Sequence, residues 1–340
     1  MKLVVTGGAG FIGSGFVRAM LARHPDVSIV TLDALTYAGN LANLESVRTD
    51  SRHRFVRGDI TDANAVDEAL AGGVDAIVHF AAESHVDRSI EDASAFLQTN
   101  VIGTQVLLDG ARRHRVGRFV HVSTDEVYGS LGAEGRFTEE SPLDPSSPYA
   151  ASKAASDLLV FAYVRTHGID AVVTRCSNNF GPFQFPEKVI PLFVTNAMAN
   201  EPLPLYGDGM NVRDWIHVED HCEALDLVLR KGRCGEVYNV SAESERANRD
   251  LTREILRRVG KPETLIRKVA DRPGHDRRYA LDAAKLRKEL GWTPRWRFED
   301  ALDATIAWYR DNEAWWRGVK SGEYLRFYDQ WYGGRLEERS

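Results

Sequence analysis

Two adjacent carboxylates stand at the end of a largely apolar segment in the first half of the chain. Residues 119–122 have the composition of a buried strand and are followed by Ser123, Thr124, Asp125 and Glu126. Two acids crowded into a desolvated cleft cannot both ionise at low cost, so one is expected to keep its proton. Such a pair can supply a general acid and a general base to one reaction. The alternative is a solvated turn or a helix cap.

A tyrosine and a lysine have a second chemically suggestive spacing. Tyr149 and Lys153 are four residues apart at the start of a strongly helical stretch, which places them on one helix face. A nearby ammonium is expected to lower the pKa of the phenol, so that Tyr149 can act as a base near neutral pH. This spacing is common by chance. It gains weight from the hydroxyl of Thr124 and from the nucleotide-binding pattern earlier in the chain.

That pattern is a glycine-rich segment directly after the first predicted strand. "VVTGGAGFIGSG" places Gly7, Gly10 and Gly13 at the turn into the first helix. Glycines here permit a tight turn and close approach to a pyrophosphate, which the free N–H groups of the helix can bind. The spacing differs from the commoner Gly-x-Gly-x-x-Gly, and a purely structural turn is the alternative. The strand–turn–helix context favours a dinucleotide site.

The acidic residues after the next two strands bear on which dinucleotide binds. Asp33 ends the second strand, 20 residues after Gly13. A carboxylate there accepts hydrogen bonds from the ribose and repels a 2′-phosphate, which predicts NAD rather than NADP. A helix N-cap is the alternative for Asp33. Asp59, after the third strand, is placed to meet the adenine, and a cap on the following helix is an almost equal alternative.

These residues require a scaffold that brings strand ends together. Short apolar strands alternate with longer amphipathic stretches, which predicts an α/β fold with a Rossmann-type, doubly wound parallel sheet. The predicted strands are 2–6, 28–32, 55–56, 76–80, 119–122 and 171–175, and the predicted helices are 11–23, 62–70, 96–114 and 149–166.

The alternation of strand and helix patterns is interrupted after residue 175. "NNFGPFQFPEKVIPLF" carries three prolines among aromatic residues, and helical patterns follow it. We therefore expect an NAD-binding domain over residues 1–175 and a smaller, mostly helical substrate lobe over 176–335. Its predicted helices are 189–199, 218–230, 248–259, 283–290 and 300–311. Segment 237–240 is a candidate to return to the sheet, so the two parts are expected to interleave.

Composition excludes several classes of function. The chain has 340 residues, 43% of them hydrophobic, and a net charge of -6, which disfavours a nucleic-acid partner. No apolar run approaches the roughly 20 residues of a membrane span, and the N-terminus is too short for a signal peptide. Cys176, Cys222 and Cys234 lack metal or disulfide spacing, and His85 and His275 lack a second histidine. A cytoplasmic protein without a metal is expected.

Several separated motifs resemble a known family. "TGGAGFIG", "STDEVYG" and "YAASK", in this order, are similar to the extended short-chain dehydrogenase/reductase superfamily. Within it, "HFAAESHVDRSI", "CSNNFGPFQFPEKVIPL", "LYGDGMNVRDWIHVEDH" and "DRPGHDRRYALD" resemble the dTDP-glucose 4,6-dehydratases, from residue 1 to about 335. The resemblance implies a lyase that converts dTDP-glucose into dTDP-4-keto-6-deoxyglucose with NAD, at the first deoxysugar-committed step of dTDP-rhamnose or other deoxysugar synthesis.

The resemblance also implies roles for five catalytic residues. Tyr149, tuned by Lys153 and hydrogen-bonded through Thr124, would remove the C4 hydroxyl proton as hydride leaves C4. Glu126 would then take the C5 proton, while Asp125 protonates the departing C6 hydroxyl. Return of the hydride to C6, with reprotonation at C5, would regenerate NAD.

Binding residues are implied motif by motif. Cofactor contacts are implied for Gly7, Gly10, Phe11, Ile12, Gly13, Asp33, Ala34, Leu35, Thr36, Asp59, Ile60, Phe80, Ala81, Ala82, Ser84, Thr99, Tyr149, Lys153 and Asn179. Substrate contacts are implied for Ser84, Thr124, Asn178, Lys188, Val189, Pro204, Leu205, Tyr206, Arg213, Asn248, Asp271, Arg272, Pro273, Gly274 and His275. Lys188 and Arg213 suit a diphosphate, with a surface ion pair as the alternative.

Other readings of the same residues remain open. A UDP-sugar 4-epimerase or UDP-glucuronate decarboxylase needs no acid pair. A GDP-mannose 4,6-dehydratase generally prefers NADP, and a non-catalytic NAD-binding regulator tends to lose the Tyr or the Lys. Residues 239–242 depart from the family pattern, which leaves the nucleotide base open. We expect a homodimer through a four-helix bundle of helices 96–114 and 149–166, and we expect Trp292, Trp296, Trp315 and Trp316 to pack in the smaller lobe.

Overall fold

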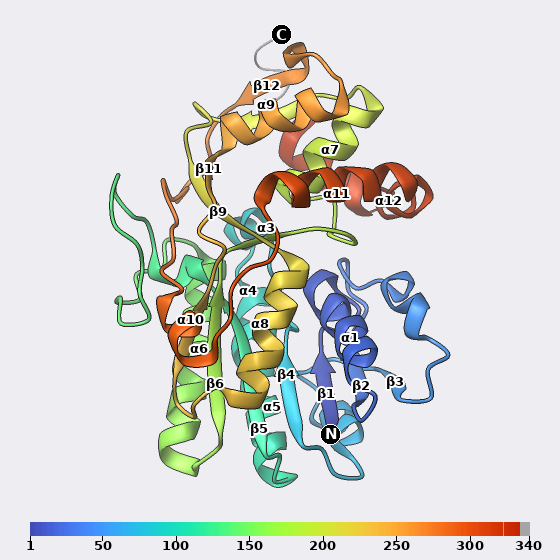
Figure 1. The fold of residues 1–340 in the computed structure, drawn as a ribbon, viewed down its shortest axis with the longest axis vertical. Helices are drawn as coiled ribbons and strands as arrows, with labels where there is room; N and C mark the ends of the chain where they lie inside the picture. The colour runs from blue at the N-terminus through green and yellow to red at the C-terminus, as the bar shows by residue number, and fades with distance from the viewer. Residues whose placement is uncertain (322, 334–340) are drawn as a thin grey trace.

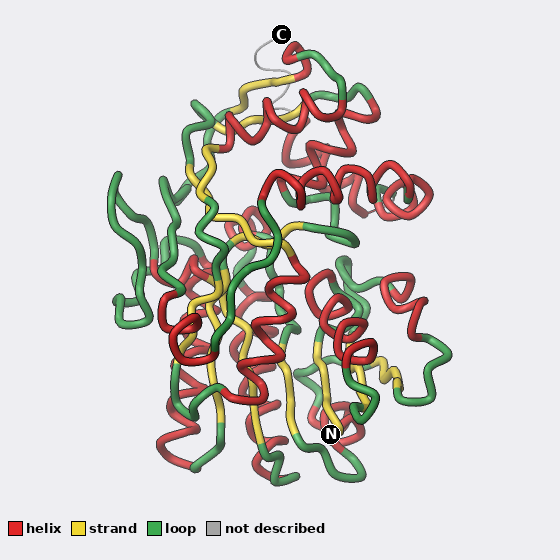
Figure 2. The backbone as a smooth tube through the Cα atoms, viewed as in Figure 1, coloured by secondary structure: helices red, strands yellow, loops and turns green. Residues whose placement is uncertain are grey.

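The computed structural model describes residues 1–321 and 323–333. A larger part, at the bottom of Figure 1, is built on a parallel sheet, and a smaller part with most of the late helices lies above it. Figure 2 shows the strands of the larger part side by side between helices. Residues 334 and 335, the end of the predicted second part, lie outside the described residues.

The main sheet has seven parallel strands in the order β10-β6-β5-β4-β1-β2-β3. This confirms the predicted doubly wound fold, and segment 237–240 does return to the sheet. The order reverses direction between β1 and β4, which opens a crevice at the carboxyl ends of these strands. The strands are β1 (Lys2–Thr6), β2 (Ser28–Asp33), β3 (His53–Arg57), β4 (Ala76–His79), β5 (Arg118–Thr124), β6 (Ala171–Cys176) and β10 (Val237–Val240).

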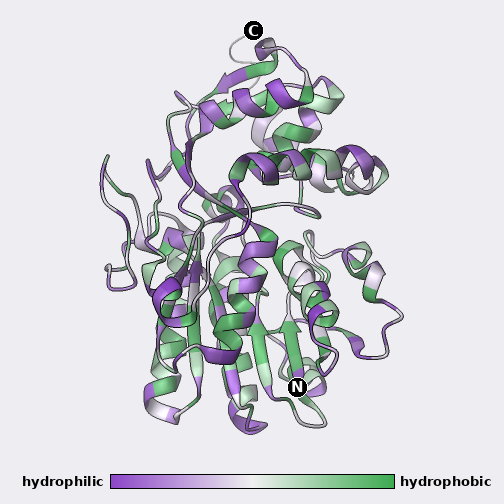
Figure 3. Ribbon diagram, viewed as in Figure 1, coloured by the Kyte–Doolittle hydropathy of each residue, from purple (hydrophilic) through white to green (hydrophobic). Residues whose placement is uncertain are grey.

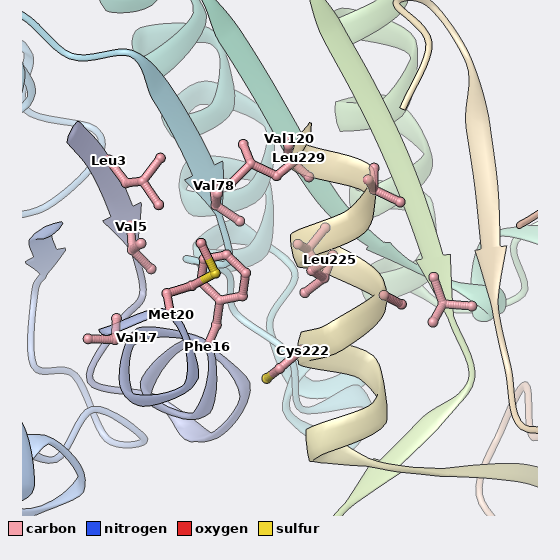
Figure 4. Packing of buried hydrophobic residues seen from close by; sticks show 14 of the residues in the cluster. Leu3, Val5, Phe16, Val17, Met20, Val78, Val120, Cys222, Leu225 and Leu229 are labelled. Carbon is pink, nitrogen blue, oxygen red and sulfur yellow. The ribbon is translucent and has the colours of Figure 1, made fainter. Parts of the chain in front are cut away.

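Both faces of the sheet are covered, because successive side chains of each apolar strand point to opposite sides. On β1, Leu3 and Val5 belong to one buried cluster and Val4 to another. The first cluster includes α1 (Phe11–Arg23) and α8 (Val218–Lys231). In Figure 4, side chains of these two helices pack over the sheet strands. The central strands are correspondingly green in Figure 3.

The opposite face is covered by α2 (Ala63–Leu70), α5 (Thr104–Arg113) and α6 (Pro148–His167). The predicted helix 96–114 is composite: α4 (Ser94–Phe96) leads into a π-helical turn η2 (Leu97–Gly103), which leads into α5. At the π turn, the side-chain amide of Asn100 donates to Ser152 Oγ of α6 at 2.8 Å, and Thr104 Oγ1 donates to the Asn100 carbonyl at 2.6 Å. The turn thereby ties this helix to α6, which carries Tyr149 and Lys153.

The smaller part contains two small sheets besides its helices, of order β11-β9-β7 and β12-β8. Sequence periodicity predicts its helices at 189–199, 248–259 and 300–311 but misses the helices after residue 311 and these short strands. Its elements are β7 (Asn178–Phe180), α7 (Val189–Ala199), β8 (Leu203–Tyr206), β9 (Val212–His217), β11 (Glu245–Ala247), α9 (Asn248–Val259), η4 (Glu263–Leu265), β12 (Ile266–Val269), α11 (Phe298–Asp311), α12 (Glu313–Val319), α13 (Glu323–Tyr328) and η5 (Asp329–Gly333).

Two late segments pack on the first sheet rather than in the smaller part. α8 and α10 (Ala284–Leu290) both join the core around β1. Trp292, directly after α10, is 1% exposed within that core. The expectation that Trp292 packs in the smaller lobe is therefore wrong, because the chain returns to the sheet before it. Trp296, Trp315 and Trp316 do pack in the second core.

The remaining short helices lie around the crevice. They are η1 (Leu41–Val47), α3 (Val86–Glu91) and η3 (Asp125–Tyr128). Among the described residues, no helix combines the length and the apolar character needed to span a bilayer.

Candidate active site

Two adjoining cavities lie at the carboxyl ends of the sheet strands. The larger, of about 300 Å³, runs from the glycine turn past Asp33 to Tyr149. The smaller, of about 150 Å³, lies between the sheet and the smaller part of the chain. The two share four lining residues, Glu126, Asn178, Glu187 and Lys188. A molecule in one cavity therefore meets a molecule in the other beside Glu126.

The glycine turn forms one end of the larger cavity. Gly7 has a φ of +67°, and a Cβ there would lie 2.6 Å from the backbone nitrogen of Ala81. Only glycine fits this position, because both the conformation and the space exclude a side chain. No side chain caps α1, and Phe11, Ile12 and Gly13 of its first turn line the cavity. This end of the cavity therefore fits the phosphates of a dinucleotide.

Asp33 lines the same cavity at the end of β2. Its Oδ2 accepts from the Ala9 amide at 2.9 Å and its Oδ1 from the Leu35 amide at 2.8 Å. Burial raises the pKa of Asp33, and these two hydrogen bonds oppose the shift. Asp33 does not cap a helix, because the next one, η1, has Asn40 as its N-cap. Each oxygen retains a lone pair, so the carboxylate can also accept from ribose hydroxyls.

Asp59 lines the cavity after β3 but does not cap the following helix. Its Oδ1 accepts from the amide and the hydroxyl of Thr61, both at 2.8 Å. Asp62 is the residue that caps α2. The helix-cap alternative for Asp59 is therefore wrong, and its position in the cavity wall agrees with the adenine reading.

The acid pair lies on η3, where β5 ends. Thr124 caps this short helix by accepting from the Glu126 amide at 3.3 Å, and its hydroxyl donates to Asp125 Oδ1 at 3.2 Å. Asp125 is 2% exposed, and its Oδ2 lacks a hydrogen-bond partner within the described chain. Burial, followed by the charge of Glu126, raises the pKa of Asp125 well above its usual value. This direction agrees with the predicted protonated Asp125.

Glu126 has a different electrostatic setting from its neighbour. Burial raises the pKa of Glu126, but Arg272, Lys188 and Arg213 all oppose that rise. Three surrounding cations thus favour the carboxylate form of Glu126 over that of Asp125. The pair therefore has the asymmetry needed for one acid and one base.

Tyr149 and Lys153 are both buried on α6. Burial, followed by the charge of Glu126, raises the pKa of Tyr149 well above its usual value, against a hydrogen bond with Thr124. The expectation of a lowered phenol pKa is therefore wrong for this arrangement. The sequence places the ammonium near the phenol but does not reveal how completely both groups are removed from water. Lys153 Nζ donates to the Val122 carbonyl at 2.9 Å, and burial lowers the lysine pKa to about 8.

The smaller cavity is rich in cationic groups held by buried acceptors. Arg213 is 6% exposed, donates to the Asp276 carbonyl at 2.9 Å, and lies over the Tyr279 ring at 4.3 Å. Lys188 Nζ donates to the Ser84 carbonyl at 2.7 Å. Burial of this kind argues against the surface ion pairs considered as alternatives. Cations in a partly desolvated cavity can bind a diphosphate.

The structure brings most of the remaining predicted contacts to these cavities. The larger is lined by Gly10, Ala34, Thr36, Ile60, Phe80, Ala81, Ala82, Ser84, Thr99, Thr124 and Asn179. The smaller is lined by Val189, Pro204, Leu205, Tyr206, Asn248, Arg272 and His275, and Asn178 lines both.

Four predicted contacts line neither cavity: Leu35, Asp271, Pro273 and Gly274. The amide of Leu35 is held by Asp33, and its backbone turns away with a φ of +54°. Asp271 is exposed, and its Oδ1 bonds with His275 Nδ1 at 2.5 Å and with the Arg272 amide at 2.9 Å. Asp271 thus supports two lining residues instead of lining the cavity itself.

Sequence reasoning missed several lining residues: Glu187, Asp87, Trp215, Tyr279 and Tyr332. The first four lie inside motifs that carry the family resemblance, so their position next to predicted contacts was an available signal. Tyr332 lies in the tail of the chain, which the resemblance also covers because it runs to about residue 335. Burial raises the pKa of Glu187 to about 7, which marks it as an unusual carboxylate at the junction of the cavities.

Comparison with known proteins gives first the class and then the family of this chain. A model of the GDP-mannose 4,6 dehydratase family matches residues 4–305, which places the chain among the sugar-nucleotide dehydratases. A dTDP-glucose 4,6-dehydratase from Streptomyces niveus is 56% identical, over 94% of this chain and 96% of that protein. The chain belongs to the dTDP-glucose 4,6-dehydratase family.

Solved structures agree with this assignment. DesIV, a dTDP-glucose 4,6-dehydratase from Streptomyces venezuelae solved with NAD and TYD bound, has 58% sequence identity and a TM-score of 0.92, with 94% of this chain and 100% of that chain covered. A dTDP-glucose 4,6-dehydratase from Bacillus anthracis in complex with NAD has 49% identity and a TM-score of 0.88, at the same coverage.

Proposed function

We propose that this protein is an NAD-dependent hydro-lyase that converts dTDP-glucose into dTDP-4-keto-6-deoxyglucose. The observation that carries the proposal is the buried pair Asp125 and Glu126, whose pKa values are pushed apart at the junction of the two cavities. The elimination of water from a sugar needs an acid and a base on neighbouring atoms, and this pair supplies both. The family membership supports the same reaction.

The larger cavity is the proposed cofactor site. The glycine turn and the uncapped start of α1 would hold the pyrophosphate, and Asp33 would hold the adenosine ribose. The hydroxyls of Ser123 and Ser177, buried without a hydrogen-bond partner in the described chain, fit a polar group in this cavity. NAD bound here would supply a hydride acceptor for C4 of the sugar and a hydride donor for C6.

The residues of the chain carry the proton transfers in this proposal. Tyr149, oriented by Thr124, takes the C4 hydroxyl proton as a phenolate and becomes a phenol, and the charge of Lys153 favours the phenolate form that begins the step. Glu126 takes the C5 proton, which the C4 ketone has acidified. Asp125 then protonates the leaving C6 hydroxyl, for which its unpartnered Oδ2 is available.

The smaller cavity is the proposed site of the dTDP group. Arg213, Lys188 and Arg272 would neutralise the diphosphate while keeping Glu126 ionised. The same cations would therefore serve both substrate binding and the base. Asn248, whose Oδ1 is buried without a partner within the described chain, is a candidate contact at the start of α9.

A homodimer is part of the proposal. Leu97 and Ile102 on η2 are 53% and 42% exposed, and Leu158 on α6 is 60% exposed. These are three of the large apolar side chains that the described chain leaves in solvent, and they lie on two neighbouring helical segments. A second copy that packs the same helices against them would bury all three. The three cysteines are free thiols, which fits the expected cytoplasmic location.

The test is incubation of the purified protein with dTDP-glucose and, separately, with UDP-glucose. We expect a 4-keto-6-deoxy sugar nucleotide from dTDP-glucose, identified by mass and by its ketone absorbance. Epimerised hexose with no loss of water would contradict the proposal. Faster conversion of UDP-glucose would retain the reaction but overturn the assigned substrate.

A further inference from the structure

A buried carboxylate lies one helical turn beyond Lys153. Lys153 and Asp157 are four residues apart on α6, which places them on one face of the helix. Lys153 is 4% exposed and Asp157 is 0% exposed. Lys153 Nζ donates a hydrogen bond to a neutral carbonyl, that of Val122. The ammonium thus has a neutral hydrogen-bond acceptor and a charged neighbour on its own helix.

Asp157 is held in its ionised form by groups on two sheet strands. Arg175 of β6 donates from Nε to Asp157 Oδ2 at 2.9 Å, and His121 Nε2 of β5 lies 3.4 Å from Oδ1. Burial favours the neutral acid, but the contact with His121 and the charge of Arg175 keep the pKa of Asp157 below its usual value. Burial of a charged carboxylate away from solvent costs free energy unless neighbouring groups compensate its charge.

Apart from Asp157 and the charged Arg175 that pairs with it, the titratable groups around Lys153 are neutral near pH 7. Burial lowers the pKa of His121 to about 4 and that of His79 on β4 well below its usual value. Burial raises the pKa of Cys176 on β6 to about 12, and Tyr149 stays a phenol. Burial lowers the pKa of Lys153 itself to about 8, and Asp157 is the leading group that opposes this fall.

We propose that Asp157 is a positioning residue for catalysis, whose carboxylate keeps the buried ammonium of Lys153 charged and so sets the alkaline limit of activity. This inference rests on the proposed function, because it concerns the lysine beside the reacting tyrosine. Asp157 lines neither cavity and would act through Lys153 alone. Arg175 and His121 contact the two oxygens of the carboxylate and so hold it in place, one helical turn from the lysine.

The test is Asp157→Asn, read in two ways on the purified protein with NAD added. With ¹³C-labelled lysine, the Lys153 ε-carbon signal, assigned by its loss in Lys153→Arg, gives the lysine titration midpoint by NMR. We expect this midpoint to fall by roughly 1 pH unit or more, because an opposite charge of this kind raises a lysine pKa by that amount. The alkaline limb of kcat should move down in pH by the same amount.

The matched control is Asp226→Asn on α8. Asp226 is also a mostly buried aspartate that pairs with a histidine and an arginine, His24 and Arg230, each at 2.7 Å, but it lies away from the cavities. Its loss should leave both midpoints unchanged. A uniform loss of activity in Asp157→Asn at every pH, with an unmoved Lys153 signal, would overturn the proposal and leave only a structural role.

A second pair of variants covers the case in which Asp157→Asn does not fold. Asp157→Glu and Asp157→Gln have the same size and differ in charge, and only the Gln variant should lower the Lys153 midpoint. Equal midpoints in the two would contradict the proposal. The NMR readout needs no turnover, so a failure of the proposed function would show as an inactive enzyme with the Lys153 shift intact.

Discussion

Arg272 and Asp87 form an ion pair that links the two parts of the protein beside the smaller cavity. Arg272 follows β12, Asp87 lies on α3, and Arg272 donates to Asp87 Oδ1 at 2.8 Å, with their side chains only 16% and 4% exposed. Arg272 is also the leading charge that lowers the pKa of Glu126. The guanidinium of Arg272 thus links the two parts of the protein and also lowers the pKa of the proposed base, Glu126.

Replacement of Arg272 should therefore move the acid limb of activity. Removing a cation raises the pKa of a neighbouring carboxylate, so Glu126 would lose its base form at a higher pH. We expect Arg272→Gln to shift the acid limb of the kcat profile upward by roughly 1 pH unit. The control is Arg277→Gln. Arg277 lies on the same loop as Arg272, but it is exposed and pairs with Asp208. This variant should not shift the acid limb. An unmoved limb in Arg272→Gln would contradict this role.

Loss of the base should separate the oxidation from the loss of water. Glu126→Gln keeps the size of the side chain but cannot take the C5 proton. We expect the release of 4-keto-6-deoxy product to fall by roughly 10²- to 10⁴-fold, which is the usual contribution of a general base. Reduced nicotinamide should still form in a single turnover, as measured by its absorbance. Product formed at the parental rate would remove Glu126 from this step. The control is Glu68→Gln, which changes an exposed side chain of α2.

The buried acid should cost stability at neutral pH. Because the folded pKa of Asp125 is raised, the protein must take up a proton there when it folds above about pH 4. This cost grows as the pH rises toward the folded pKa. Asp125→Asn removes this cost. We therefore expect the free energy of unfolding at pH 7 to be larger in the variant by an amount on the order of 1 kcal/mol, which is seen as a higher unfolding temperature. This gain in the free energy of unfolding should vanish near pH 4. A gain of equal size at pH 4 and pH 7 would contradict the role given to the Asp125 proton.

The proposed dimer predicts the effect of a single surface charge. Leu158→Glu puts a carboxylate on the helix surface that the proposed dimer would bury, and burial of that charge in an interface is unfavourable. We expect sedimentation velocity to show a dimer for the parent and a monomer for this variant. Leu41→Glu on η1, where the leucine is 49% exposed, is the control and should stay dimeric. A parent that sediments as a monomer would overturn the proposed interface.

Local pattern in the sequence predicted the scaffold closely, because the strands are apolar throughout and the helices begin after turn residues. α1, α7 and α9 have the bounds that periodicity gives them. The π turn at Leu97–Gly103 was not predicted, since it depends on the contact of Asn100 with Ser152 of a distant helix. Trp292 was misplaced for a similar reason, because its partners come from elements far away in the chain.

The chemistry of the candidate site was harder to predict than its location. The residues of the acid pair and of the Tyr–Lys pair were found from their spacing together with the nucleotide-binding pattern and the family resemblance. The direction of the Tyr149 pKa was not, because it depends on burial and on Glu126, which lies on another element. Asp271 was assigned to the cavity with its neighbours, although its side chain holds His275 and the Arg272 amide instead.

The return of β10, α8 and α10 to the first sheet has a consequence for how such enzymes diversify. The chain passes from the sheet core to the second core after β6, comes back for α8 and β10, leaves again at β11, and returns once more at α10. No single cut in the polypeptide would release an intact half. A recombination that exchanged only the tail of this gene with that of a relative would also replace α8, β10 and α10, so the incoming helices and strand would have to fit the retained strands of the sheet as well as bring a new substrate site.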